Sequence, residues 1–445
     1  MELFGTDGVR GVANTELTPK LALDLGAAAA RALGRGHAPT FVIGRDTRIS
    51  GTLLESALAA GLCSLGGNVV SAGVVPTPAV AGIVRSEKYD AGIVISASHN
   101  PFADNGIKFF GPDGYKLDDA VESEIEALVP TADTLPRPSG VGVGRLRSDP
   151  HLSDLYAEHL EETMEGLRLD GLKVVLDGAN GAAFEIGPRV LSDLGAHVTV
   201  LGCAPDGVNI NDGCGSLHPE TMMRRVVEDG ADVGVAFDGD ADRVILADEN
   251  GRKVDGDRMM LLIGRHLHTQ GRLVKGTVVG TIMSNLGLEV ALSESGLTLL
   301  RTNVGDRYVS EAMRREGYVI GGEKSGHVIF GHLTTTGDGL LTALQVLKVM
   351  RETGKSLSEL SDQMTEYPQV LLGVKVRDRK VWEADSDVQK AITHVEQTLS
   401  GRGRLNVRAS GTEMLVRVMA EGPDQAEIDS LAGEIAALVR KKFGA

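Results

Sequence analysis

The chain has 445 residues, with 45 basic and 61 acidic side chains, so its formal net charge is −16. A hydrophobic content of 42% with 57 glycines and 15 prolines is typical of a globular α/β protein, and the length suggests about three domains. The acidic balance argues against a nucleic-acid binder or an anionic-membrane binder. Cys63, Cys203 and Cys214 lie far apart without metal-ligand spacing, which argues against a disulfide framework or a zinc site.

The N-terminal sequence MELFGTDGVRG has no basic segment followed by an apolar one, and no apolar run reaches ~18 residues. We therefore expect a cytoplasmic protein without membrane or nucleic-acid partners. If the substrate is an anion, basic side chains must gather locally against the negative field of the chain.

An internal repeat is visible when the apolar runs are aligned. A first run occurs at 40–46, 173–181 and 276–285. A second run follows roughly 40 to 60 residues later, the spacing of a strand, a crossover helix and a return strand; its copies lie at 90–100, 232–242 and 317–327. Each second run ends in a polar loop that bears glycine, and ligands of open α/β sheets gather at the carboxyl ends of strands. The repeat therefore predicts one composite site built from three loops.

The predicted architecture is three similar α/β mixed-sheet domains plus a smaller C-terminal α+β domain around a central cleft. Pro130–Gly144 is a linker-like stretch near the end of the first unit, and a turn at Asp248–Lys253 separates the second unit from the third. After Tyr367 the pattern changes to alternating strands and a terminal amphipathic helix. The predicted domains are 1–150, 151–252, 253–366 and 367–445.

The sequence ISASHNP at Ile95–Pro101 follows a short apolar run, Ala91–Ile95, that is typical of a buried strand. A hydroxyl held on a tight turn at the end of a strand, beside His99 and an Asn-Pro turn, is well placed to react. The same residues also fit a serine that only caps a loop. A serine hydrolase is disfavoured, because Ser98 lacks the Gly-x-Ser-x-Gly elbow.

Three carboxylates alternate in the sequence FDGDADR: Asp238, Asp240 and Asp242, followed by Arg243. Carboxylates at alternate positions of a loop can converge on one hard cation, and the arginine suits a phosphate beside it. An EF-hand calcium loop fits poorly, because its sixth position holds Arg243 instead of glycine and both flanks are typical of strands. An acidic surface turn is the remaining alternative.

Two further loops offer groups that suit a phosphorylated sugar. RASGTE at Arg408–Glu413 joins two predicted strands and provides hydroxyls, a glycine and backbone N–H groups, which are the parts of an anion-binding nest. GGEKSGH at Gly321–His327 places Glu323 and Ser325 two residues apart, where both can hydrogen-bond vicinal hydroxyls. Taken alone, the first also fits an ordinary hairpin turn and the second an ordinary polar loop.

Together the four loops resemble the α-D-phosphohexomutase superfamily, in which a phosphoserine loop, a DGDxDR metal loop, a GExSGH sugar loop and an RxSGT phosphate loop occur in this order, one per domain. The resemblance covers essentially the whole chain. Four stretches are similar to the branch that acts on hexosamine phosphates: Phe4–Gly11, Ile43–Gly51, Pro205–Ser216 and Val304–Val309. Lys324 stands where glutamine is usual, and Met414 stands where proline usually follows SGTE.

The resemblance implies an isomerase that interconverts glucosamine 6-phosphate and glucosamine 1-phosphate, on the way to UDP-N-acetylglucosamine and cell-wall precursors. It implies a phosphoserine enzyme and a bisphosphorylated hexosamine that serves as intermediate and activator. A phosphoglucomutase or phosphomannomutase is the alternative, because one sequence does not identify the residues that distinguish an amine from a hydroxyl at the sugar C2. A non-catalytic sugar-phosphate sensor is disfavoured, because it could dispense with the serine and the acidic triad. Whether the chain forms a homodimer stays open.

The resemblance also implies a role for each site residue. Ser98 is expected to carry the phosphoryl group and, with Asp238, Asp240 and Asp242, to hold one Mg²⁺ per chain. Lys108 matches the family's general acid/base, Arg10 matches the arginine beside it, and His99 is grouped with them as catalytic. The expected substrate-binding residues are Arg243, Glu323, Ser325, His327, Arg408, Ser410, Gly411, Thr412 and Arg417.

Overall fold

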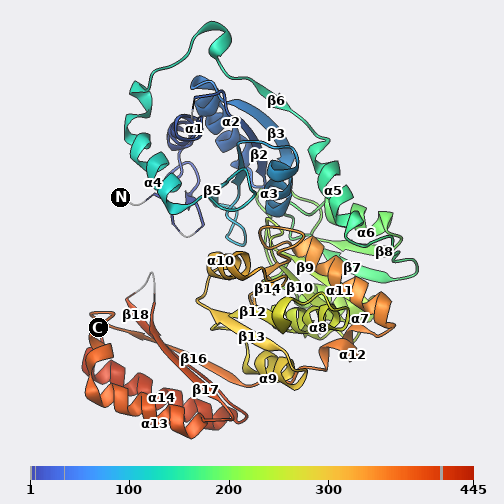
Figure 1. Ribbon diagram of the computed structural model, residues 1–445, viewed down its shortest axis with the longest axis vertical. Coiled ribbons are helices and arrows are strands. Elements are labelled where there is room, and N and C mark those ends of the chain that lie inside the picture. Colours follow the sequence, from blue (N-terminus) through green and yellow to red (C-terminus); the bar gives the residue numbers. More distant parts are fainter. Residues whose placement is uncertain (1–2, 6, 35, 411–413) are drawn as a thin grey trace.

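The computed structural model describes residues 3–5, 7–34, 36–410 and 414–445. Its strands form four sheets that follow one another along the chain (Figure 1). Among the described helices, none is both long and apolar enough to cross a membrane. Two of the expected substrate-binding residues, Gly411 and Thr412, lie outside the described part of the chain.

The first unit has a six-stranded sheet in the order β1-β5-β4-β2-β3-β6. Its strands are β1 (Val9–Val12), β2 (Thr40–Arg45), β3 (Asn68–Val74), β4 (Ala91–Ile95), β5 (Asp104–Phe110) and β6 (Leu146–Ser148), and its helices are α1 (Pro19–Leu33), α2 (Gly51–Ser64), α3 (Thr77–Ser86) and α4 (Asp119–Leu128). β4 is parallel to β2 and antiparallel to β5. The linker-like stretch forms short 3₁₀ turns, and directly after it the chain returns to this sheet as β6 beside β3.

The second unit has a five-stranded sheet in the order β11-β10-β9-β7-β8. Its strands are β7 (Lys173–Asp177), β8 (His197–Leu201), β9 (Val233–Phe237), β10 (Val244–Asp248) and β11 (Lys253–Val254), and its helices are α5 (Leu152–Glu162), α6 (Ile186–Asp193) and α7 (Glu220–Asp229). β9 is parallel to β7 and antiparallel to β10. The acidic loop is the turn between β9 and β10.

The third unit has a four-stranded sheet in the order β13-β12-β14-β15. Its strands are β12 (Thr277–Thr281), β13 (Thr298–Thr302), β14 (Gly321–Gly322) and β15 (Val328–Ile329), and its helices are α8 (Gly256–Thr269), α9 (Leu286–Glu294), α10 (Asp306–Glu316), α11 (Gly339–Thr353) and α12 (Leu357–Ser361). The strand predicted at 317–327 is reduced to β14, where a Cβ on Gly321 would lie 2.9 Å from Val279. This close approach favours glycine, which is a weak strand former.

The three α/β units share one strand pattern. A central strand pairs in parallel with a second strand, and the second strand turns back as an antiparallel partner: β2-β4-β5, β7-β9-β10 and β12-β14-β15. The serine, acidic and sugar loops each occupy the turn between the second strand and its return. The repeat seen in the sequence therefore places three different loops at one equivalent position.

The fourth unit is a smaller antiparallel sheet, ordered β16-β18-β17, with two helices. Its elements are β16 (Gln369–Lys375), α13 (Ser386–Leu399), β17 (Arg404–Ala409), β18 (Leu415–Glu421) and α14 (Gln425–Phe443). It has an apolar core of its own, centred on residues such as Trp382, Val418 and Ile435. By contrast, one buried apolar cluster runs continuously through the first three units. In Figure 1 the β17–β18 hairpin extends upward from this fourth unit, on the side that faces the first unit.

Candidate active site

Ser98 lies in the turn after β4 and is 1% exposed. Its φ of 51° is in the left-handed region, which is uncommon for a residue other than glycine. Its Oγ donates a hydrogen bond to Oδ2 of Asp238 at 2.6 Å, and Nδ1 of His99 is 3.4 Å away. A strained backbone at a buried hydroxyl is typical of functional sites, because the surrounding structure must maintain it. The fold thus presents this serine to the acidic loop of the second unit.

The acidic loop gathers three buried carboxylates, Asp238, Asp240 and Asp242, with one oxygen of each within 4.8 Å of the others. Oδ1 of Asp240 and Oδ1 of Asp242 are buried without a hydrogen-bond partner. Burial, and then repulsion from Asp242 and Asp240, raises the pKa of Asp238 well above its ordinary value. Unpaired buried carboxylates are unfavourable unless their charge is compensated. The cluster therefore fits a hard divalent cation bound by oxygen ligands.

The backbone of the acidic loop explains how it meets the serine. A Cβ on Gly239 would lie 2.5 Å from the carbonyl oxygen of Ser98, so only glycine permits this approach. Ala241 adopts a φ of 56° within the same turn. The turn is flanked by the antiparallel strands β9 and β10, as the sequence predicts, and not by the two helices of an EF-hand.

Lys108 on β5 is 2% exposed and lies against the same cluster. Its Nζ is 2.9 Å from Oδ2 of Asp240 and 3.2 Å from Oδ2 of Asp7. Burial lowers the pKa of Lys108, but the two carboxylates outweigh this effect and raise the pKa above its ordinary value. Arg10 on the neighbouring strand β1 forms an ion pair with Asp7. Lys108 and Arg10, both predicted from the sequence, are therefore joined through a carboxylate that was not predicted.

Arg243 and His99 face each other across the two loops. Nη1 of Arg243 donates to Nδ1 of His99 at 2.7 Å. Burial, followed by the charges of Arg243 and Arg10, lowers the pKa of His99, so its neutral ring accepts this bond. Nε of Arg243 is buried without a hydrogen-bond partner. A guanidinium with an unused N–H beside the serine can bind an anion attached to that serine.

The sugar loop rests on the second unit. The N–H of Val244 donates to the carbonyl of Gly326 at 3.2 Å, and a Cβ on Gly326 would lie 1.9 Å from the carbonyl oxygen of Val244. This approach requires the glycine, whose φ is 92°. Glu323 is half-buried and its Oε1 accepts from the N–H of Gly305 at 3.0 Å, whereas Ser325 is exposed.

His327 is buried at the base of the sugar loop. Its Nδ1 is 3.6 Å from Oδ2 of Asp242, and its Nε2 accepts from the N–H of Gly337 at 3.1 Å. Burial lowers the pKa of His327, but Asp242 and Asp306 raise it above its ordinary value. The ring therefore joins the sugar loop to the acidic loop, and at 2% exposed it presents little surface to a ligand.

Lys324 points out of the sugar loop. Its Nζ is 2.7 Å from Oε1 of Glu366, in the segment that leads to the fourth unit, and 3.8 Å from Oδ2 of Asp255. Lys324, which stands where the family usually has glutamine, therefore has two carboxylates as partners for its charge. These contacts direct the ammonium away from the acidic triad.

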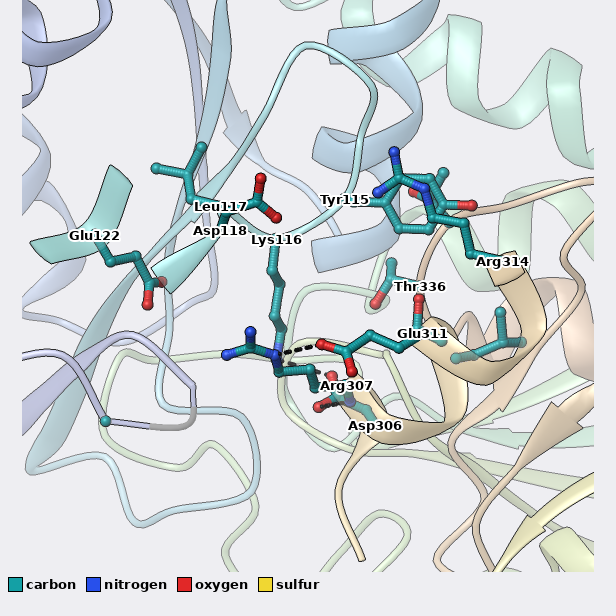
Figure 2. Close-up of a pocket in the computed structure, with 14 residues that line it drawn as sticks. Tyr115, Lys116, Leu117, Asp118, Glu122, Asp306, Arg307, Glu311, Arg314 and Thr336 are labelled. Atoms are coloured by element: carbon teal, nitrogen blue, oxygen red, sulfur yellow. Dashed lines mark hydrogen bonds and ion pairs between the residues drawn. The ribbon is translucent and has the colours of Figure 1, made fainter. Parts of the chain in front are cut away.

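A cavity of about 100 Å³ lies between the first and third units, and Figure 2 shows its lining. Lys116 extends from the segment after β5 toward Asp306 at the start of α10, with Nζ and Oδ2 2.8 Å apart. The same Nζ is 2.7 Å from Oδ1 of Asp7. Carboxylates and ammonium groups therefore alternate from Asp240 through Lys108, Asp7 and Lys116 to Asp306. This chain of ion pairs connects all three α/β units around the acidic triad.

The fourth loop is described only in part. Arg408 on β17 and Arg417 on β18 occupy directly opposed positions of the antiparallel ladder. Burial, and then the charge of Arg417, lowers the pKa of Arg408. Ser410 is buried, and its N–H donates to the carbonyl of Leu415 at 2.8 Å. Two guanidinium groups at opposed positions of a hairpin can bind one anion between them.

Within the described residues, the structure brings most of the predicted site residues together but not all of them. Ser98, His99, Lys108, Arg243 and the acidic triad form one connected cluster, which also includes Arg10 through Asp7 and His327 through Asp242. Arg408, Ser410 and Arg417 belong instead to the fourth unit. These residues lie on the separate β17–β18 hairpin.

Besides Lys116 and Asp306, four residues that contact the cluster were not predicted from the sequence. Asp7 links two lysines, and Thr77 donates to Oδ2 of Asp240 at 2.7 Å. Arg48 and Asn211 donate to the carbonyl oxygen of Ser98, both at 2.9 Å. Asp7, Arg48 and Asn211 lie in the stretches that resemble the hexosamine-phosphate branch. That resemblance was the sequence signal that could have identified them. Thr77 lies in VVPTPAV, where nothing distinguishes it from a helix-capping residue.

Comparison with known proteins identifies the family. The chain matches the descriptions "Phosphoglucomutase/phosphomannomutase, alpha/beta/alpha domain I" over residues 1–135, domain II over 154–251, domain III over 255–367, and the C-terminal domain over 371–438. The chain therefore belongs to the phosphoglucomutase/phosphomannomutase family, the α-D-phosphohexomutases. Among its curated relatives, the phosphoglucosamine mutase of Heliobacterium modesticaldum is 52% identical over 458 residues and covers 99% of both chains. The phosphoglucosamine mutase of Desulforudis audaxviator is 54% identical, covering 98% of this chain and 97% of its own.

Solved structures show the same fold. A phosphoglucomutase/phosphomannomutase family protein from Burkholderia thailandensis superposes with a TM-score of 0.82 at 23% identity, covering 100% of this chain and 99% of its own. The Aspergillus fumigatus N-acetylphosphoglucosamine mutase, solved with GlcNAc-6P and magnesium, gives a TM-score of 0.69 at 18% identity, covering 99% and 95%. The arrangement of three α/β units and a C-terminal domain is thus shared across distant members.

Proposed function

We propose that the chain is a phosphoglucosamine mutase, which interconverts glucosamine 6-phosphate and glucosamine 1-phosphate. Curated relatives of that name match it over almost its full length at 52% and 54% identity. The observation that supports the chemistry best is the 2.6 Å hydrogen bond from Ser98 to Asp238, which holds a buried hydroxyl against an acidic cluster.

In the proposed route, Ser98 carries the phosphoryl group between half-reactions. A free hydroxyl of the sugar phosphate attacks the phosphorus: its new O–P bond forms as the bond to Ser98 Oγ breaks, and the hydroxyl proton passes to Ser98 Oγ, which gives a bisphosphorylated hexosamine and a free serine. The sugar then turns around, and Ser98 Oγ attacks its other phosphate: the new bond to Ser98 forms as the sugar O–P bond breaks, and the serine proton passes to the sugar oxygen. The net result moves the phosphate from one end of the sugar to the other and restores the phosphoserine.

Phosphoryl transfer requires positioning, charge neutralisation and a proton path. Lys108 is the proposed proton carrier, because its buried ammonium lies 2.9 Å from Oδ2 of Asp240, in the acidic loop that faces Ser98. Arg243 is proposed to bind the phosphate on Ser98 through the part of its guanidinium that His99 does not use. Glu323 and Ser325 are proposed to bind sugar hydroxyls. Arg408, Ser410 and Arg417, with Gly411 and Thr412 outside the described residues, are proposed to hold the phosphate that is not reacting.

The acidic triad is proposed to hold one Mg²⁺, together with the phosphate on Ser98. The all-oxygen donor set and the two buried, unpaired oxygens support this assignment. When bound, the cation would supply charge neutralisation at the transferring group. The A. fumigatus relative was solved with magnesium in its structure.

A substrate panel tests the proposed function. The purified protein is mixed with Mg²⁺, a trace of bisphosphorylated sugar and glucosamine 6-phosphate, glucose 6-phosphate or mannose 6-phosphate, and ³¹P NMR follows each 1-phosphate. We expect the highest kcat/KM with the amino sugar. Faster conversion of glucose or mannose 6-phosphate would instead indicate the phosphoglucomutase/phosphomannomutase alternative. Conversion of none of them would contradict a mutase.

A further inference from the structure

Arg48 is a buried arginine in the turn after β2, and it is 1% exposed. Its charge is matched by one carboxylate, since its Nε donates to Oδ2 of Asp46 at 2.8 Å and neither side chain has exposed surface. A buried ion pair of this kind gives little net stability compared with apolar residues. Its presence therefore calls for an explanation beyond stability.

The remaining N–H groups of Arg48 bind the backbone of the serine loop. Nη2 donates to the carbonyl oxygens of Ser98 at 2.9 Å and Asn100 at 2.8 Å. Nη1 donates to the carbonyl oxygen of Asp104 at 3.0 Å and also to that of Pro101. A guanidinium can satisfy so many acceptors because it holds five N–H donors in one rigid plane, which an ammonium does not. One side chain thus fixes four carbonyls of the loop.

The N–H side of Ser98 leads back to the same ion pair. The backbone N–H of Ser98 donates to Oγ of Ser96 at 2.9 Å. The hydroxyl of Ser96 in turn donates to Oδ2 of Asp46 at 2.6 Å, the oxygen that Arg48 also binds. Both the N–H and the carbonyl of Ser98 are therefore set by the Asp46–Arg48 pair.

A residue of the second unit also binds the serine loop. Nδ2 of Asn211 donates to the carbonyl of Ser98 at 2.9 Å and to that of Asn100 at 3.2 Å. Asn211 lies between β8 and α7, so these bonds cross from one unit to the other. Gly239 packs against the same carbonyl. The carbonyl of Ser98 is thus the point where both units fix the serine loop.

We propose that Arg48 is a positioning residue that holds Ser98 in its left-handed conformation, with Asn211 holding it from the second unit; this rests on the proposed role of Ser98 as phosphoryl carrier. Without these bonds the backbone relaxes from its φ of 51° toward the favoured negative region. The hydroxyl then turns away from Asp238. The loops proposed to bind sugar do not depend on Arg48, so phosphoryl transfer slows while substrate affinity is retained.

The substitution Arg48→Lys tests the proposal, because it keeps the charge and removes the fork of donors. We expect kcat for glucosamine 6-phosphate to fall by about 10- to 100-fold, the effect of a small misplacement of a reacting group, with KM changed by less than about twofold. Hydrogen exchange followed by mass spectrometry should show faster exchange in peptides covering 96–104. The matched control is Arg301→Lys, since Arg301 also binds two backbone carbonyls and a carboxylate, but in the third unit away from the triad. It should change neither readout.

The two readouts separate this proposal from the proposed function. Wild-type turnover of the amino sugar tests the proposed function. The hydrogen-exchange rate at 96–104 tests whether Arg48 fixes the serine loop, and this measurement requires no turnover. Unchanged exchange in Arg48→Lys, or unchanged kcat in an active enzyme, would overturn the proposal. Should Arg48→Lys lose its cooperative thermal transition, Asn211→Gly takes its place, because glycine accepts the φ of 59° at this position and the substitution removes the side chain that donates to Ser98. We expect a several-fold lower kcat at constant KM, and a wild-type kcat in this variant would overturn the proposal.

Discussion

Ser98 and Asp238 are joined by a 2.6 Å hydrogen bond although 140 residues separate them in the chain. Both lie in the same place within their units, in the turn between the second strand of the repeat and its antiparallel return. A repeated unit therefore supplies a reactive hydroxyl in one copy and a charged cluster in the next. The site forms because the copies pack with these equivalent turns together, at the carboxyl ends of the strands.

The first prediction concerns the covalent carrier. Intact-mass measurement of the protein incubated with bisphosphorylated sugar should show an adduct of ~80 Da, the mass of one phosphoryl group on serine. Ser98→Ala should lose the adduct and nearly all turnover, because no other hydroxyl among the described residues donates to Asp238. Ser86→Ala, at the far end of α3, is the control and should retain both. An alanine variant at 98 with normal turnover would exclude the serine as carrier.

The second prediction concerns the cation. A chelator should abolish turnover, and Mg²⁺ should restore it better than Ca²⁺, because three loop carboxylates and a phosphate suit the smaller, octahedral ion. Asp242→Asn removes one charge and should weaken Mg²⁺ binding, measured by calorimetry, by about tenfold or more. Asp229→Asn alters a surface pair with Arg225 and serves as the control. Full activity in excess chelator would contradict the metal assignment.

Local sequence patterns were sufficient to predict much of the fold. The run at Ala91–Ile95 forms β4 and the run at 233–237 forms β9, because both are short, apolar and followed by turn residues. The alternation after Tyr367 forms β16 and β18, and the predicted terminal helix forms as α14, Gln425–Phe443. The domain limits at 150, 252 and 366 stay predictions.

Long-range contacts could not be predicted in the same way. Thr77 reaches Asp240 across 163 residues, and a single sequence gives no register for such a pair. The course of the chain after Pro130–Gly144 could not be predicted either, since a stretch rich in glycine and proline does not indicate that the next residues, Leu146–Ser148, pair with the first sheet as β6. Arg48 lies in Ile43–Gly51, one of the stretches that resemble the hexosamine-phosphate branch. Only the fold shows that its side chain binds the serine loop.

The third prediction concerns pH and Asp338, which caps α11. Its Oδ1 accepts from the N–H of Leu341 and from the hydroxyl of Tyr156, both at 2.9 Å. Burial raises the pKa of Asp338 to about 6. A carboxyl in the unfolded chain has a pKa of about 3.9, so the folded state binds more protons between these values. The contribution of Asp338 to stability therefore decreases as pH rises from about 4 to about 6 and is constant above that.

Asp338→Asn should remove this dependence, because the amide oxygen keeps both hydrogen bonds and the charge is lost. We expect the midpoint of thermal unfolding of the variant, relative to wild type, to increase between about pH 4 and pH 6 and then to level off. Asp338→Ala, which also loses the cap, should be less stable than Asp338→Asn by about 1 kcal/mol. A constant difference between Asp338→Asn and wild type across this window would contradict the argument.

The fourth prediction concerns the proposed distal phosphate site. The sugar must present first one end and then the other to Ser98, so one fixed anion pocket has to serve both orientations. Arg408 is the best candidate among the described residues, since its guanidinium can bind two phosphate oxygens and it stands directly opposite a second arginine, Arg417. Arg408→Ala should raise KM for both the 1-phosphate and the 6-phosphate by ~10-fold or more, as expected for the loss of a charge-assisted contact of about 1.5–3 kcal/mol.

The same substitution should not impair the fold or the phosphoserine. Arg408 is half-buried on β17 and is not among the residues of the apolar core of the fourth unit, so the thermal midpoint of Arg408→Ala should stay close to that of wild type. The phosphate on Ser98 should still form, because Arg408 lies on β17 of the fourth unit, whereas Ser98 is held by residues of the first two units. Arg402→Ala, a surface arginine of the same unit paired with Glu427, is the control and should keep both KM values. The measurements are steady-state kinetics in both directions and intact mass. An unchanged KM in both directions for Arg408→Ala would mean that another residue binds the distal phosphate. Arg307, at the rim of the cavity between the first and third units, would be tested next.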